Sequence, residues 1–425
     1  MSTPYKSLIN FATETRVLHF AQPSLGTRLP ASMHACRMGN TTCKMALVAA
    51  LLLTGGAGAE NRTTLRDFPV GTHGRWEHTP AEFVFYNRAE EPVFRLRAPT
   101  VKPAPRSRHH HRKFDASCLA RADPAAVLAG ARGGWGVIGF RNDEFEPLAV
   151  MTFVTRDPAR KKLAPGAVGA KLGRVAGYMR REAALFRDFA RVINATTGPA
   201  RVLDIGANHG IFAIFAALRG ARVAAVEAQA TLASVVKVAT LANGVDVDVF
   251  HNAILDVPAM VEIAELGASN DVNEGGTASL GAPREAPMVQ VRTASVDLVA
   301  SEVFGAEPID FLKIDVEGVE IPALRASLEL LGRGGVREGS VEFGPAKRWE
   351  DSEKHGVAGA NPAAAVDVLR RIGAAGYDTY VTYGGTKGCV PALNATGGLV
   401  REAFVRENQL AVVKRGLANP CIRSV

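Results

Sequence analysis

Cysteine is scarce in this sequence, which has five in 425 residues: Cys36, Cys43, Cys118, Cys389 and Cys421. Their spacing matches no metal-binding motif, which excludes a cysteine-based zinc site. In an oxidising compartment Cys389 and Cys421 could form a disulfide, whereas elsewhere both would remain thiols. We favour the second interpretation.

Long hydrophobic runs are also lacking. No stretch of about eighteen apolar residues follows residue 60, which excludes a membrane-spanning helix from the body of the chain. Apolar residues make up 47% of the sequence, as in globular proteins, and the length suits one large or two ordinary domains.

Excess charge is missing from most of the chain. The net charge is +8, but Lys and Arg counted against Asp and Glu leave +4 in residues 1–59, +5 in residues 60–113 and −1 in the remainder. A nucleic-acid substrate usually requires a basic face, so we expect none for the nearly neutral later part.

Residues 44–60 resemble a secretory signal: a lysine, a short apolar segment and small residues at a cleavage point. We therefore predict a leader over residues 1–59 and entry into the secretory pathway, in the ER or Golgi lumen or outside the cell. Residues 1–44 contain a single acid, Glu14, so an organelle transit peptide is the alternative. Four glycosylation triplets are compatible with a lumenal fate and begin at Asn40, Asn61, Asn194 and Asn394.

Residues 60–113 mix proline, arginine and a histidine run at 109–111, which predicts a basic linker without stable structure. Binding of a metal or an acidic surface by the histidine run is the alternative. Residues 114–180 contain short apolar segments that we expect to form an N-terminal cap over the site. Residues 416–425 are predicted to be a C-terminal tail.

From residue 181 strand and helix patterns alternate. Helices are predicted at residues 183–193, 211–218, 232–243, 319–331 and 363–372. Strands are predicted at residues 201–205, 221–226, 245–249, 309–315, 338–343, 377–383 and 409–414. Such alternation predicts a doubly wound, mostly parallel α/β sheet, since each crossover must cover a sheet face. Residues 265–287 lack periodicity and are predicted to be a long surface loop of the kind that forms lids.

The most informative segment is the turn after the first of these strands. Gly206 and Gly210 bracket it, and the helix that follows would point its free N–H groups at a ligand. The next strand ends at Glu227, an acid suited to accept hydrogen bonds from two ribose hydroxyls. The pattern D-x-G-x-N-x-G is not the G-x-G-x-x-G of dinucleotide folds. Because the carboxylate of Asp204 would repel phosphates but orient a cationic amino acid, S-adenosylmethionine fits better than NAD.

A second cluster of ionisable residues ends the strand at 309–315. Lys313, Asp315, Glu317 and Glu320 lie there, at the edge where open α/β sheets bind ligands. For Glu320 a simpler interpretation exists, because a carboxylate in a first helical turn opposes the helix dipole.

Together these segments resemble the FkbM family of S-adenosylmethionine-dependent methyltransferases. The resemblance covers about residues 180–415 and rests on four segments in order: 204–210, Glu227, 295–298 and 313–320. It implies a domain at residues 181–415 with a seven-stranded class I methyltransferase sheet of order 3-2-1-4-5-7-6. It also implies O-methylation, commonly of sugar or polyketide hydroxyls.

The resemblance also implies roles for single residues. Asp204, Gly206, Asn208 and Gly210 would surround the methionine part of the cofactor, and Glu227 would hold the ribose. Asn252 and Ala253 lie where the family contacts adenine. His209 fills a variable position and is expected to be a wall residue rather than a base.

For catalysis we expect Asp315 or Glu317 to take the proton of the acceptor hydroxyl, and Lys313 to hold that carboxylate or a substrate oxygen. A metal held by Asp315, Glu317 and Glu320 is an alternative that we do not favour, because no fourth ligand is evident. The favoured acceptor is a hydroxyl of a sugar or glycan. A protein or small-metabolite acceptor, or a cofactor-binding protein without catalysis, are the other hypotheses.

Overall fold

The computed structural model describes residues 74–78, 82–87, 92–97, 114–123, 135–142, 148–155, 182–264, 288–383, 388–401, 403 and 408–417. The chain divides into two units, residues 1–62 and 63–425, and every described residue lies in the second. The predicted leader, the histidine run, the predicted lid at 265–287 and most of the predicted tail lie outside the described residues. Among the described helices, none is both long and apolar enough to cross a bilayer.

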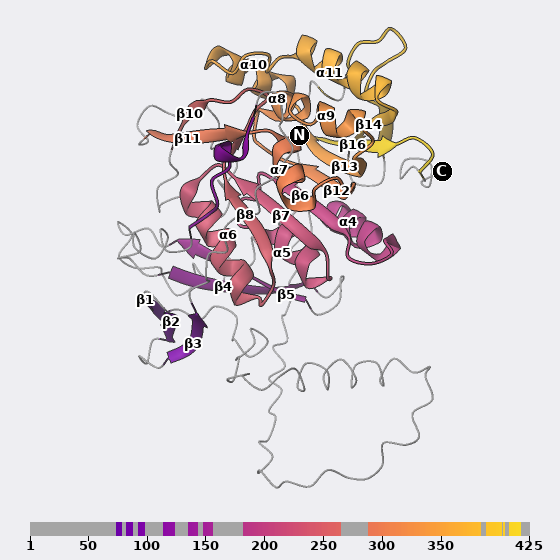
Figure 1. Ribbon diagram of the computed structural model, residues 1–425. Helices are drawn as coiled ribbons and strands as arrows, with labels where there is room; N and C mark the ends of the chain where they lie inside the picture. The colour runs from indigo at the N-terminus through magenta and orange to yellow at the C-terminus, as the bar shows by residue number, and fades with distance from the viewer. Residues whose placement is uncertain are drawn as a thin grey trace, which may run out of the picture. The chain divides into compact units, whose positions relative to one another are not determined.

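An eight-stranded sheet forms the centre of the fold (Figure 1). Its order is β15-β14-β16-β13-β12-β6-β7-β8. The strands are β6 (Arg201–Ile205), β7 (Arg222–Glu227), β8 (Val247–His251), β12 (Ile309–Ile314), β13 (Val336–Phe343), β14 (Tyr377–Tyr383), β15 (Gly388–Pro391) and β16 (Asn408–Lys414). Neighbours from β8 to β13 pair in parallel, while β16, β14 and β15 are antiparallel. The predicted order is confirmed for seven strands, and β15 is an additional edge strand.

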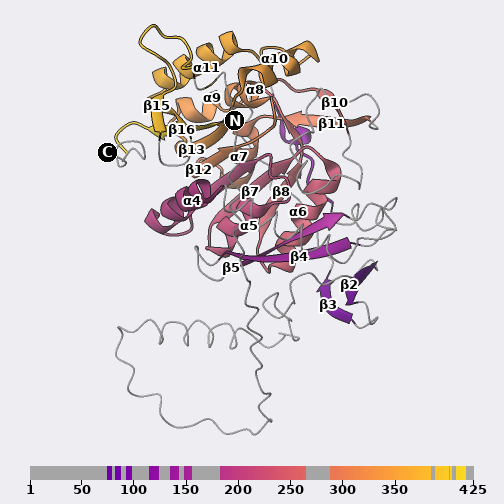
Figure 2. The ribbon, with the colours of Figure 1, turned by 180° about the vertical axis from the view of Figure 1, so that it is seen from behind.

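Helices cover both faces of this sheet (Figures 1 and 2). One apolar core joins the sheet to α4 (Ala183–Ala195), α5 (Ile211–Leu218) and α6 (Ala230–Ala242). The other joins it to α7 (Val296–Phe304), α8 (Glu320–Arg325), α9 (Leu328–Gly332), α10 (Ala346–Lys354) and α11 (Pro362–Ala374). Strand residues alternate between the two cores: Val202 belongs to the first, and Leu203 and Ile205 belong to the second. This alternation is why adjacent residues of β6, Val202 and Leu203, are both apolar.

The prediction of one continuous helix at residues 319–331 is wrong, because the structure contains two shorter helices there, α8 and α9. The break lies at Ala326 and Ser327, where the Ser327 hydroxyl donates to the Leu324 carbonyl. A serine that bonds a nearby carbonyl competes with the helical pattern. The helices α7 and α10 were not predicted.

Three further small sheets are described. Strands β9 (Ala253–Ile254), β10 (Met260–Ala264) and β11 (Met288–Ala294) form one, and β4 (Trp135–Asn142) and β5 (Leu148–Thr155) form a hairpin. Strands β1 (Gly74–His78), β2 (Glu82–Asn87) and β3 (Pro92–Arg97) form an antiparallel sheet where a linker was expected. Both β2 and β3 are rich in aromatic and β-branched residues, which favour strands and account for this difference.

Candidate active site

The turn between β6 and α5 is shaped by close packing against the protein itself. Gly206 and Gly210 have φ of 76°, and Asn208 has φ of 52°. A Cβ on Gly206 would lie 1.7 Å from the carbonyl oxygen of Asp315, and one on Gly210 would lie 2.8 Å from Val236 Cγ1. The glycines therefore let the β6 turn approach the end of β12 and the helix α6, in addition to any ligand.

Asp204 and Lys313 are partners across the β6–β12 pair. Asp204 is fully buried, and Lys313 Nζ lies 3.3 Å from Asp204 Oδ1 and 3.3 Å from Asp315 Oδ2. The same ammonium lies 5.2 Å above the Phe212 ring of α5. Burial raises the pKa of Asp204, and the nearby lysine opposes that rise. Neither Asp204 oxygen accepts a well-formed hydrogen bond from the described residues, so this carboxylate keeps acceptor sites for a hydrogen-bond donor beside the Lys313 ammonium.

Glu227 lies at the end of β7, beside the turn. Its two oxygens accept from the backbone N–H groups of Asn208 and Gln229, each at 2.8 Å. The side chain is 7% exposed, and burial raises its pKa to about 7 although these hydrogen bonds oppose the rise. The structure thus brings Asp204 and Glu227 to the same turn from neighbouring strands, as the sequence predicted.

Asn252 has a clear structural role. Its amide nitrogen donates to the carbonyls of Cys118 and Arg292 at 2.8 and 3.0 Å, and its oxygen accepts from Ala120 N–H at 2.9 Å. All three bonds are internal, and the residue is 1% exposed. The adenine contact of Asn252 and Ala253 therefore stays a prediction, and the Asn252 side chain already makes three hydrogen bonds within the protein.

The segment 114–123 is held on the edge of the sheet. Backbone bonds join Ala122 N–H to Val249 O and His251 N–H to Ala120 O, and Phe114 is buried in the second core. Part of the predicted N-terminal cap thus packs beside the end of β8. The sequence held no periodic signal for this docking, because it is made by single residues.

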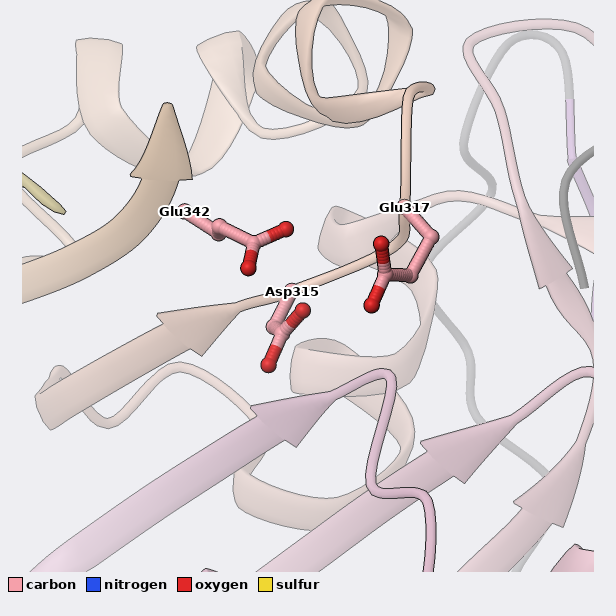
Figure 3. A group of neighbouring side chains, drawn as sticks. All are labelled: Asp315, Glu317 and Glu342. Atoms are coloured by element: carbon pink, nitrogen blue, oxygen red, sulfur yellow. The ribbon is translucent and has the colours of Figure 1, made fainter. Parts of the chain in front are cut away.

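Three carboxylates meet at the ends of β12 and β13. Ligand oxygens of Asp315, Glu317 and Glu342 all lie within 4.8 Å of one another, and Figure 3 shows the three groups turned toward a shared space. Arg348 of α10 lies with Nη1 3.2 Å from Glu317 Oε2 and also donates to Glu342. Glu342 was missed by the sequence analysis, because a lone acid in a strand has no local motif.

Glu320 points elsewhere. It is fully buried, with Oε1 accepting from Gly318 N–H at 2.7 Å and Oε2 accepting from Trp349 Nε1 at 2.9 Å. Burial raises its pKa. These bonds tie α8 to α10, so Glu320 acts as a structural residue and the cluster contains Glu342 in its place. The half-buried His209 has its pKa lowered to about 4 by burial, so the ring is neutral at physiological pH, as suits a wall residue.

Residues 204–368 match the family described as the methyltransferase FkbM domain, which confirms the family resemblance over this segment. The chain therefore carries a methyltransferase domain of the FkbM type. No curated protein matches the sequence significantly.

Solved methyltransferase structures resemble this chain at low similarity. One is the 16S rRNA N2 G1207 methyltransferase of T. thermophilus with AdoMet and guanosine, at 12% identity and a TM-score of 0.27, covering 66% of this chain and 51% of that one. The bifunctional kinase-methyltransferase WbdD has 12% identity and a TM-score of 0.32, with 57% and 40% covered. An O-methyltransferase of Bacillus cereus in complex with SAH has 15% identity and a TM-score of 0.27, with 58% and 91% covered. The chain thus spans about half or less of the length of the first two.

Proposed function

We propose that this protein is an S-adenosylmethionine-dependent O-methyltransferase that methylates a hydroxyl of a sugar or glycan. One observation carries the proposal: Asp204 and Glu227 lie at one glycine turn, and the carboxylates of Asp315 and Glu317 follow the adjacent strand. A candidate cofactor site beside a candidate proton acceptor supports the proposal.

The donor set fits the cofactor. Asp204 offers buried oxygens without well-formed hydrogen bonds among the described residues, which suits the ammonium group of the methionine part. Glu227 offers a carboxylate already oriented by two backbone N–H groups, which suits ribose hydroxyls. When bound, S-adenosylmethionine supplies a methyl group activated by its sulfonium sulfur.

The residues of the chain then have two tasks. The half-buried carboxylates of Asp315 and Glu317, 26% and 27% exposed, can reach an acceptor hydroxyl and take its proton. Lys313 and Arg348 hold these carboxylates in place. Alignment of acceptor and methyl group supplies up to about 7–11 kcal/mol in well-oriented reactions.

The test combines cofactor binding with transfer. Calorimetry with S-adenosylhomocysteine on the full-length protein should show binding that Asp204→Asn weakens strongly. Asp310→Asn is the matched control, since Asp310 is a buried carboxylate at the opposite end of β12. Labelled methyl transfer to an oligosaccharide panel should then identify hydroxyl acceptors. Absence of binding, or equal effects of the two substitutions, would refute the proposal.

We also propose that the protein acts in the secretory pathway. A disulfide at Cys389 supports this and corrects the thiol interpretation that we favoured from the sequence, since disulfides persist in oxidising compartments. Sequencing the N-terminus of the mature protein tests the proposal: a start near residue 60 supports it, and retention of residues 44–59 contradicts it.

A further inference from the structure

Glu342 is a carboxylate of the candidate active site with surroundings unlike those of its neighbours. It lies near the end of β13 and is 8% exposed, whereas Asp315 and Glu317 follow β12 and reach solvent. Its carboxylate turns toward both of them (Figure 3). A buried carboxylate beside two others costs free energy when it ionises.

The charges around Glu342 do not balance. Among the described residues, the cations that contact the cluster are Arg348, which bonds both Glu342 and Glu317, and Lys313, which lies at 3.3 Å from both Asp315 and Asp204. Within this described set, two cations face four carboxylates. Glu320 on α8 adds a further carboxylate nearby, and Gln409, opposite Glu342 on β16, is neutral.

A proton is the simplest way to reduce this negative charge. Burial, followed by the charges of Asp315 and Glu317, raises the pKa of Glu342 to about 11, although Arg348 opposes the rise. Two carboxyl groups at close range commonly share one proton in this way. A divalent cation would be another solution, but Arg348 and Lys313 already contact these oxygens and would repel it.

We propose that Glu342 is a positioning residue for methyl transfer: it holds a proton and donates it in a hydrogen bond to Asp315 or Glu317, so that an ionised carboxylate stays oriented toward the acceptor. This inference rests on the proposed function. The acceptor oxygen forms the new O–CH₃ bond while the S–CH₃ bond breaks and its electron pair stays on sulfur. The hydroxyl proton passes to the ionised carboxylate, and Glu342 keeps its own.

Two substitutions distinguish this role from a purely structural one. Glu342→Gln resembles the protonated acid, so kcat should stay within roughly threefold of wild type at pH 6–7, and the acidic limb of its pH profile should not move. Glu342→Ala removes the donor and should lower kcat about a hundredfold. Glu338→Gln is the control, because Glu338 lies on the same strand and pairs with Arg191 away from the cluster.

The proposal is overturned if Glu342→Gln is as inactive as Glu342→Ala. It is equally overturned if the acidic limb of Glu342→Gln shifts to lower pH, because that shift would show that a negative charge had been removed. Addition of Mg²⁺ with recovery of activity after EDTA treatment would assign the cluster to a metal instead.

A second readout does not depend on activity. If folded Glu342 holds a proton that the unfolded chain releases above pH 4.5, wild-type stability falls relative to Glu342→Gln as pH rises. Denaturation midpoints at pH 5, 7 and 9 should therefore diverge, and parallel curves would refute the proposal. This result stands even if no hydroxyl acceptor is found, so it separates failure of this inference from failure of the proposed function.

Discussion

The affinity for S-adenosylhomocysteine should depend on pH through Glu227. Its pKa lies at about 7 because the carboxyl group is buried. Only the ionised form can accept hydrogen bonds from two ribose hydroxyls through both oxygens. At pH 6 about one molecule in eleven is ionised and at pH 8 about ten in eleven, so the apparent Kd should be about tenfold higher at pH 6.

Replacement of Glu227 by glutamine should remove this pH dependence. The amide has one acceptor oxygen in place of two and no charge, and loss of a charge-assisted pair costs about 2–3 kcal/mol. The expected Kd is therefore about 30- to 150-fold weaker than wild type at pH 8. Isothermal titration calorimetry between pH 6 and 8 measures both effects.

Asp297 supplies the matched control for this experiment. Its pKa is also raised to about 7 by burial, but it lies on α7 and accepts from Leu330 N–H. Asp297→Asn should keep the tenfold pH dependence of cofactor affinity. His209, with a pKa of about 4, does not titrate in this range. A slope that survives Glu227→Gln, or disappears with Asp297→Asn, would refute the assignment of Glu227.

Three further predictions follow from the same structure. Gly206→Ala should prevent folding or destabilise the protein by more than about 3 kcal/mol, because the added Cβ would lie 1.7 Å from the Asp315 carbonyl oxygen. Gly220→Ala is the control for backbone strain alone, because Gly220 has φ of 84° and its Cβ would meet nothing within 4 Å. Equal melting temperatures of the two variants would contradict the clash at Gly206. Asn252→Ala should destabilise the protein by about 2–4 kcal/mol in urea denaturation, because three buried hydrogen bonds are lost. Unchanged stability with weaker cofactor binding would instead support the adenine contact. The cofactor-free protein should be more stable at pH 5 than at pH 8, because the raised pKa of Glu227 favours the folded state below the unfolded value of 4.5, and this benefit is lost as the pH rises through about 7. Glu227 alone accounts for about 3 kcal/mol, so Glu227→Gln should reduce the pH dependence measured by chemical denaturation by about that amount.

Local patterns in the sequence were sufficient for most elements of the domain. Apolar runs between glycines predicted β6, β7 and α5 to within one residue, because a buried parallel strand and its crossover helix need such runs. The α8–α9 break was missed, since the helical pattern continues through Ser327. The edge strand β15 was missed because it is short and pairs only with β14.

The residues of the candidate site were likewise predicted from the sequence only in part. Asp204, Glu227 and the segment from Lys313 to Glu317 are each placed by a strand end that the sequence marks. Glu342 and Arg348 carry no such mark. They join the cluster because β13 pairs with β12 and because α10 packs over the end of β13, with Phe343 and Trp349 in edge contact.

The sequence alone determined where strands end, where the backbone turns and which charged residues follow those turns, since these depend on neighbours along the chain. Only the tertiary structure decided that Glu342 faces Asp315, that Lys313 lies between two aspartates and that Asn252 holds the segment at 118–120. Such contacts depend on which strands pair and how helices pack over them, and those choices are made by the whole core rather than by any one segment.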